Sequence, residues 1–162
     1  MIKIFHLSDI HLDSPFSLCS AGEAEKRRME LRSSFSSAVL YAKEQGTQLC
    51  FIAGDLFDSE YITGDGIQFI SGVIRSYPDC RFFLSPGNHD PATDDSPYST
   101  MSFPKNLHIF RDRERIDIPE LNTTVYGVGF RSAVMNESPV TGWGNLDPSR
   151  INILVTHGDA SS

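Results

Sequence analysis

The chain carries, in its first half, the stretch Phe51-Ile52-Ala53-Gly54-Asp55-Leu56-Phe57-Asp58, in which an apolar run ends abruptly in a glycine and two carboxylates. The apolar run begins at Leu49, and a short continuous run of this kind is typical of a strand buried on both faces. Open α/β sheets bind their ligands at the carboxyl ends of the strands. The stretch therefore predicts a strand that delivers Asp55 to such an edge.

Three other strand-like runs end in polar side chains in the same way. Residues 2–7 lead to Asp9 and His11, residues 82–85 lead to Asn88, His89 and Asp90, and residues 151–155 lead to His157. Packing alone does not explain four apolar runs that each end in Asp, Asn or His. We therefore expect a metal site that is assembled from four loops at one edge of the sheet.

The segments between the first three runs have a helical pattern. Apolar residues recur at helical spacing in residues 23–45, which predicts a helix that ends near Gly46. A second apolar face predicts a helix that begins near Gly64 and ends at Tyr77-Pro78. The alternation of strands and helices predicts right-handed crossovers and a largely parallel α/β core.

The second half of the chain differs in composition and in its pattern of apolar residues. Residues 91–104 are rich in Pro, Ser, Thr and Asp, and we expect them to form a loop. Three short strand-like segments follow at residues 107–110, 115–118 and 123–130, the last two joined by a hairpin-like connection. Here we expect the sheet to turn antiparallel.

The bulk composition is that of an ordinary globular protein. The 162 residues, 40% hydrophobic and 22% charged, predict one compact domain over residues 1–162. No apolar run is long enough to cross a membrane, and the start has no leader pattern, so we expect a cytoplasmic protein. A net charge of −7 argues against a stand-alone, non-specific nucleic-acid binder. Bound divalent cations would offset that charge where a phosphate docks.

The polar side chains at the four strand ends form a set of oxygen and nitrogen donors without sulfur. Such a set suits Mn, Fe, Zn or Mg better than a structural zinc. A carboxylate such as Asp55 can bridge two cations, and paired cations activate water and hold the oxygens of a phosphoryl group. His89 is a candidate to protonate the leaving oxygen, and Asp90 could orient its ring. The metal ligands we predict are Asp9, His11, Asp55, Asn88 and His157.

The order of these motifs resembles that of the calcineurin-like metallophosphoesterases. The motifs are Asp9-x-His11, Gly54-Asp55-x-x-Asp58, Gly87-Asn88-His89-Asp90 and His157-Gly158. The resemblance implies a layered β-sheet sandwich flanked by helices and a dinuclear metal site. It also implies that Asp9 and His11 hold the first metal, that Asn88 and His157 hold the second, and that Asp55 bridges them. His89 would be the catalytic histidine, and Asp58 would support its loop.

Within that family, three stretches resemble the SbcD-like DNA repair exonucleases. They are the opening at residues 6–16, the Gly54–Asp58 stretch and residues 106–110. This resemblance implies manganese-dependent cleavage of phosphodiesters in DNA and a partner ATPase of the SMC-like type. A phosphomonoesterase or small-molecule phosphodiesterase on the same dinuclear site remains an alternative.

One part of the family pattern is absent. A further Gly-His-x-His stretch follows the last histidine in the family, and no such stretch follows His157 here. We therefore expect a C-terminally truncated domain, with an inactive, metal-poor scaffold as the alternative of another class. The charged run Glu25–Arg28 is expected to be a solvated helix face, and a phosphate contact by Arg27 or Arg28 is the other interpretation. Trp143 is expected to pack locally.

Overall fold

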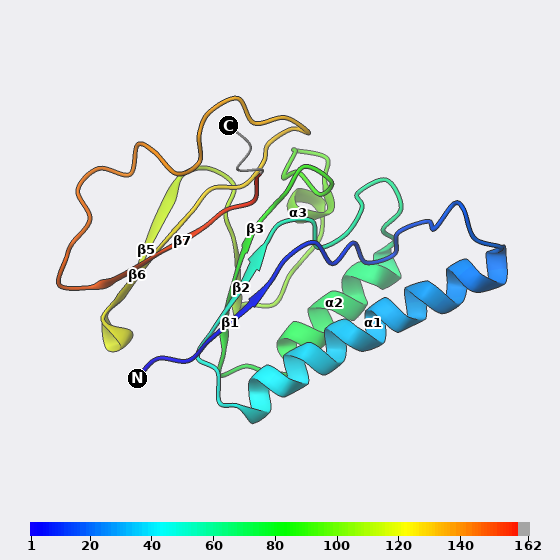
Figure 1. The fold of residues 1–162 in the computed structure, drawn as a ribbon, viewed down its shortest axis with the longest axis horizontal. Helices are drawn as coiled ribbons and strands as arrows, with labels where there is room; N and C mark the ends of the chain where they lie inside the picture. Colours follow the sequence, from blue (N-terminus) through cyan, green and yellow to red (C-terminus); the bar gives the residue numbers. More distant parts are fainter. Residues whose placement is uncertain (159–162) are drawn as a thin grey trace.

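The computed structural model describes residues 1–158, which form two β-sheets and a layer of helices (Figure 1). One helical layer, a four-stranded sheet and a three-stranded sheet stack in that order, which confirms the predicted layered α/β architecture. The elements in chain order are β1 (Ile4–Leu7), α1 (Ala21–Glu44), β2 (Leu49–Ala53), α2 (Gly64–Arg75), β3 (Arg81–Ser85), α3 (Pro97–Thr100), β4 (Leu107–Ile109), β5 (Glu114–Ile118), a 3₁₀ turn (Pro119–Leu121), β6 (Thr123–Gly127) and β7 (Ile151–Val155).

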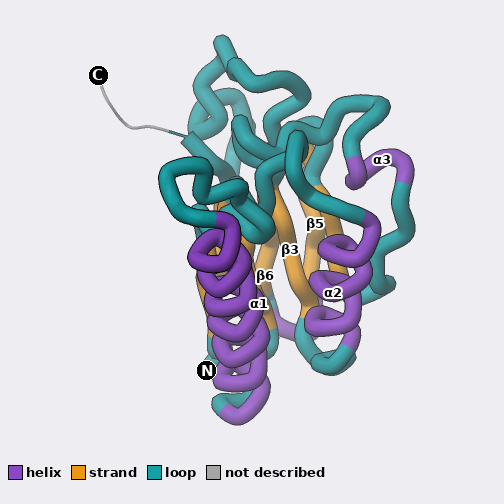
Figure 2. The backbone as a smooth tube through the Cα atoms, turned by 90° about the vertical axis from the view of Figure 1, so that its right-hand side faces the viewer, coloured by secondary structure: helices purple, strands orange, loops and turns teal. Residues whose placement is uncertain are grey.

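The first sheet has the order β1-β2-β3-β4, and all its neighbouring strands are parallel. Helices α1 and α2 run side by side over one of its faces (Figure 2). They are the two crossover connections that the sequence pattern predicts. The fold therefore carries the ends of β1, β2 and β3 to one edge.

Helix α1 has the end signals that its sequence contains. Ser20 is its N-cap and forms a capping box with Glu23, in which each side chain accepts a hydrogen bond from the other residue's amide. Beyond the C-cap, Gly46 has φ +64°, a left-handed conformation that glycine adopts without steric cost. Phe35 and Val39 face the sheet and are buried. The helix is thus fixed in register against the first sheet.

The second sheet departs from the expectation for the second half of the chain. β4 does not turn antiparallel, because it pairs with β3 in parallel. The antiparallel pair, β5 and β6, belongs to a separate sheet, in which β7 is parallel to β6. The four predicted loops therefore come from two sheets and not from one.

The two sheets meet through an apolar layer of their own. Phe51 and Phe83 stack at 5.7 Å between ring centroids and pack with Val125 and Val155 of the second sheet. Neighbouring residues of β2 and β3 face the helices instead. Both faces of β2 are consequently covered, which explains why its sequence is an unbroken apolar run. This packing brings the end of β7 beside the ends of β2 and β3.

The connecting loops after β1, β2 and β3 gather at the upper end of the molecule in Figure 2. Within the described part of the chain, no helix combines the length and the apolar character needed to cross a bilayer.

Candidate metal centre

Two loops are joined by backbone hydrogen bonds at the centre of the site. The amides of Ile10 and His11 both donate to the carbonyl of Asp55, at 2.9 and 3.0 Å, and the amide of Asp9 donates to the carbonyl of Gly54 at 3.1 Å. Asp9, His11 and Asp55 all have left-handed φ values, between 49° and 53°. Such conformations are costly for residues with side chains and cluster at functional sites. The loops after β1 and β2 therefore form one preorganised unit.

Two glycines let the side chains of the site approach one another. A Cβ atom at Gly54 would lie 2.4 Å from Cβ of His157, and Gly54 itself has φ +82°. A Cβ atom at Gly87 would lie 2.2 Å from Oδ1 of Asp55. The motif glycines are thus required by close contact, because any larger residue would occupy the space of a predicted ligand.

The structure brings all five predicted ligands together around Asp55. On one side, ligand atoms of Asp9, His11 and Asp55 lie within 4.8 Å of one another. His11 Nε2 lies 3.6 Å from Asp55 Oδ2. On the other side, His157 Nε2 lies 3.4 Å from the same Oδ2 and 3.1 Å from Oδ1 of Asn88. Asp55 Oδ2 therefore lies near the imidazole of His11 on one side and near the imidazole of His157 on the other.

The hydrogen bonds at the back of these imidazoles fit a bound cation. His157 Nδ1 lies 3.0 Å from the carbonyl oxygen of Ala53, and His11 Nδ1 lies 2.8 Å from Asp58 Oδ1. Both oxygens only accept, so each Nδ1 is the donor, and in the neutral imidazole the lone pair of each Nε2 then faces Asp55. Metal-ligating histidines have this arrangement. A cation bound there would satisfy the electron pairs that converge on this point, and the oxygen and nitrogen donors suit a divalent metal.

The predicted catalytic histidine, His89, lies beside this cluster. Its Nδ1 is 3.1 Å from Asp58 Oδ1, the oxygen that also contacts His11, and the two imidazole rings meet edge to face at 4.9 Å. Burial alone raises the pKa of Asp58, but hydrogen bonds from His11 and Ser14 outweigh that effect and lower the net pKa below its ordinary value. Asp58 is therefore an ionised carboxylate that touches both rings, a contact that the sequence did not predict.

The chain matches a known protein family over nearly its whole length. The family described as "Calcineurin-like phosphoesterase" matches residues 2–161. The chain belongs to the calcineurin-like phosphoesterase family. It is also 23% identical, over 99% of its length, to "Uncharacterized metallophosphoesterase YhaO" of Bacillus subtilis (strain 168). The chain spans 41% of the length of that relative.

The family match agrees with the side chains that gather at this edge. Two groups among the described residues are candidates to hold a divalent metal ion: Asp9, His11 and Asp55, and His11, Asp58 and His89.

Asp90 of this calcineurin-like phosphoesterase differs from the expectation that it orients the ring of His89. Its side chain is fully buried, and the ring of His89 contacts Asp58 instead. Asp90 Oδ1 accepts from the amides of Gly87 at 2.6 Å and Asp55 at 3.1 Å. Burial raises the pKa of Asp90 to about 6, against hydrogen bonds that favour the charged form. Asp90 faces the backbone because three amides from two loops converge on it.

Tyr98 is a further member of the site's support. Its hydroxyl donates to Asp90 Oδ2 at 2.6 Å, and the same oxygen accepts from the amide of Leu56 at 2.8 Å. The ring is buried and lies 5.0 Å from the ring of Phe57. Asp90 and Tyr98 together join the loop after β2 to the loop after β3. Tyr98 has no signal in the sequence, because it lies in a segment with the composition of a loop.

Two other residues that the sequence left open now have positions. The indole nitrogen of Trp143 donates to the carbonyl of Pro139 at 2.8 Å, and the ring meets Tyr126 at 5.4 Å. Trp143 thus packs locally, as expected. Arg27 pairs with Glu30 at 3.0 Å on an exposed face of α1.

Proposed function

We propose that this calcineurin-like phosphoesterase is a metal-dependent phosphodiester hydrolase that cleaves DNA as an SbcD-like exonuclease in DNA repair. The observation that carries the metal-dependent part is the position of Asp55 Oδ2, which lies 3.6 Å from Nε2 of His11 and 3.4 Å from Nε2 of His157. The proposal places two divalent cations at this site, and the resemblance to the SbcD-like branch favours Mn²⁺.

The chain's own residues have separate tasks in the proposed reaction. When bound, paired cations supply an activated water and stabilise charge on the phosphoryl oxygens. Asp9 and His11 would hold one cation, Asn88 and His157 the other, and Asp55 both.

His89 acts on the leaving group. Because its Nδ1 faces Asp58, its Nε2 is the nitrogen that can give a proton. The attacking water releases one proton to solvent as its oxygen forms a bond to phosphorus, and the bond from phosphorus to the leaving oxygen breaks. The leaving oxygen takes the proton from Nε2 of His89, which solvent then protonates again.

The choice of DNA and of a partner rests on sequence resemblance. The stretches at residues 6–16, 54–58 and 106–110 resemble the SbcD-like branch, and this branch implies an SMC-like ATPase as partner. A cytoplasmic location is part of the same proposal. All three concern the whole protein, whereas the chain spans 41% of its relative YhaO.

The test is hydrolysis of three phosphate esters over a Mn²⁺ titration. We expect the chain to hydrolyse bis(p-nitrophenyl) phosphate and labelled DNA, and to prefer both to p-nitrophenyl phosphate. His89→Asn should retain the thermal shift caused by Mn²⁺ but lose turnover. His108→Asn is the matched control, because His108 pairs with Glu114 away from the site.

Three other results of these assays would contradict parts of the proposal. A preference for p-nitrophenyl phosphate would identify a phosphomonoesterase on the same site. Absence of both a Mn²⁺-dependent thermal shift and turnover would identify a metal-poor scaffold. Unaltered turnover in His89→Asn would remove that histidine as the acid.

A further inference from the structure

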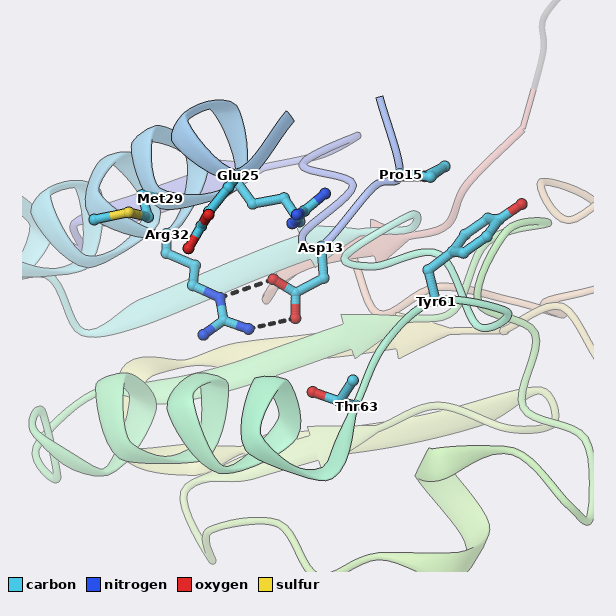
Figure 3. Close-up of a pocket in the computed structure, with 8 residues that line it drawn as sticks. Asp13, Pro15, Glu25, Met29, Arg32, Tyr61 and Thr63 are labelled. Atoms are coloured by element: carbon cyan, nitrogen blue, oxygen red, sulfur yellow. Dashed lines mark hydrogen bonds and ion pairs between the residues drawn. The ribbon is translucent and has the colours of Figure 1, made fainter. Parts of the chain in front are cut away.

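A hollow of about 490 Å³ opens beside the candidate metal centre. Its walls come from the loop after β1, the first half of α1 and the loop after β2 (Figure 3). The residues that line it are Asp13, Pro15, Glu25, Arg28, Met29, Arg32, Tyr61 and Thr63.

Short stretches of chain connect the hollow to the metal centre. Asp13 lies two residues after the predicted ligand His11. The amide of Tyr61 donates to the carbonyl of Asp58 at 2.9 Å, so Tyr61 is fixed to the residue that contacts His11 and His89. Three residues of chain span at most about 11 Å. A polymeric substrate with one phosphate at the metal centre would therefore reach the hollow with a neighbouring unit.

The floor of the hollow is rigid and electrically neutral. Asp13, which is 6% exposed, accepts hydrogen bonds from Nε and Nη2 of Arg32 at 2.7 and 2.5 Å (Figure 3). The guanidinium of Arg32 also lies over the ring of Phe69, at 5.4 Å. A Cβ atom at Gly66 would lie 2.4 Å from Asp13 Oδ2. Asp13 and Arg32 thus form an ion pair, and each neutralises the charge that the other could offer to a ligand.

Arg28 also lines the hollow, and its guanidinium is not paired with a carboxylate of the described residues. Its side chain is half-buried, and within residues 1–158 it has no ion pair or side-chain hydrogen bond. Its neighbour Arg27 is exposed and pairs with Glu30. The acid in the wall, Glu25, lies with Met29 at the end of the hollow away from Tyr61 (Figure 3). A half-buried guanidinium beside an open hollow favours an anionic ligand.

Tyr61 gives the other end of the hollow an aromatic surface. The residue is 49% exposed, and within the described part of the chain its hydroxyl has no hydrogen-bond partner. Open aromatic rings combined with arginine are the contacts by which proteins bind single-stranded nucleic acid, with bases stacked on rings and phosphates near cations.

We propose that this hollow binds the nucleotide next to the scissile phosphate of a single DNA strand, an inference that rests on the proposed function. The base stacks on Tyr61 and the phosphate contacts Arg28. The charged run of α1 then divides into two roles: Arg27 belongs to the solvated face and Arg28 to the substrate.

The test is binding of a fluorescently labelled single-stranded oligonucleotide, followed by anisotropy with Mn²⁺ in a His89→Asn background that does not cleave it. We expect Tyr61→Ala and Arg28→Ala each to weaken binding about tenfold. Tyr61→Phe keeps the ring and should bind as the background does. Arg27→Ala is the matched control and should also leave binding unchanged. Loss of the Arg28 contact should reduce the slope of log K against log salt by about 0.7, and Arg28→Lys should restore it.

The outcomes separate this inference from the proposed function. Hydrolysis of bis(p-nitrophenyl) phosphate by the unsubstituted chain decides the phosphodiesterase. If that assay succeeds but Arg28→Ala and Tyr61→Ala bind the strand like the background, the nucleotide site alone is overturned. Equal dependence of an acidic peptide on Arg28 and Tyr61 would also overturn it, in favour of a protein ligand. Thermal unfolding of each variant identifies any loss of binding that comes from misfolding.

Discussion

The Nε2 atom of His157 lies 3.4 Å from Oδ2 of Asp55, although the two residues follow strands of different sheets. Their contact requires β7 to pack against β2 through the apolar layer between the sheets. The metal centre consequently forms only when the whole sandwich has formed. A cation bound there binds the folded state and not the unfolded one, so it stabilises the fold.

The first prediction concerns Asp55, the carboxylate common to both halves of the centre. At a Mn²⁺ concentration of 100 times Kd, binding should raise the free energy of unfolding by about 2.7 kcal/mol. In Asp55→Asn this gain should vanish, because the bridging charge is lost. Urea unfolding with and without Mn²⁺ measures it. Asp112→Asn, which alters an exposed carboxylate paired with Arg131, should keep the full gain. Retention of the gain in Asp55→Asn would contradict the bridging role.

The second prediction concerns Gly54. Alanine there would place its Cβ atom 2.4 Å from His157 and would have to adopt φ +82°. We expect Gly54→Ala to lower the free energy of unfolding by at least about 2 kcal/mol and to abolish the Mn²⁺ effect. Gly72→Ala is the control, because no atom lies within 4 Å of a Cβ atom at that helical position. It should gain up to about 1 kcal/mol. Equal stability of the two variants would contradict the close contact.

Local sequence signals predict much of this fold, and their physical basis explains why. The unbroken apolar run at β2 indicates a strand that is buried on both faces. The helical spacing in α1 indicates a helix that is buried on one face. Both patterns can be read from residues that are close in sequence. The side chains predicted as ligands gather at one edge because each lies in the loop that follows a strand, and the carboxyl ends of these strands lie together. The metal roles of these residues remain predictions.

The features that sequence reasoning did not predict depend on long-range contacts. Nothing in the pattern of β4 says whether it joins its predecessor in parallel, because pairing is fixed by which strand lies beside it. Asp90 follows His89 directly, yet its carboxylate turns to buried amides of other loops. Tyr98 and the hollow beside Tyr61 arise where separate segments meet. The periodicity of nearby residues carries no information about contacts between segments that are far apart in the sequence.

The third prediction concerns the hydroxyl of Tyr98. Tyr98→Phe keeps the ring against Phe57 but removes a 2.6 Å hydrogen bond to Asp90. We expect a loss of about 1–3 kcal/mol in the free energy of unfolding, because the partner carboxylate is buried. Tyr126→Phe is the matched control and should lose less, since its hydroxyl makes a longer hydrogen bond of 3.3 Å to a residue that is not fully buried. Losses of equal size in urea unfolding would contradict a special role for Tyr98.

The last prediction concerns the pH dependence that Asp90 gives to stability. Burial raises its pKa to about 6 in the folded state, above the ordinary value of a carboxyl group. Between about pH 4 and pH 6 the folded chain therefore binds more protons than the unfolded chain, so the free energy of unfolding falls as the pH rises. A difference of about two pKa units corresponds to about 3 kcal/mol at most. Asp58, whose pKa is lowered, has the opposite sign and loses its contribution only as the pH falls below the ordinary carboxyl range.

Urea unfolding with EDTA at several pH values isolates the contribution of Asp90 from metal binding. The unsubstituted chain should become less stable from about pH 4 to about pH 6, and Asp90→Asn should have a flatter profile over the same range, whatever its absolute stability. Asp95→Asn is the control, because Asp95 is exposed and its pKa is lowered by a hydrogen bond from Thr93. Its profile above pH 4 should match that of the unsubstituted chain. Asp90→Asn could instead keep the same slope of unfolding free energy against pH. Another group would then titrate in this range. The carboxylate of Asp90 would stay ionised throughout, because its four hydrogen-bond donors outweigh the effect of burial.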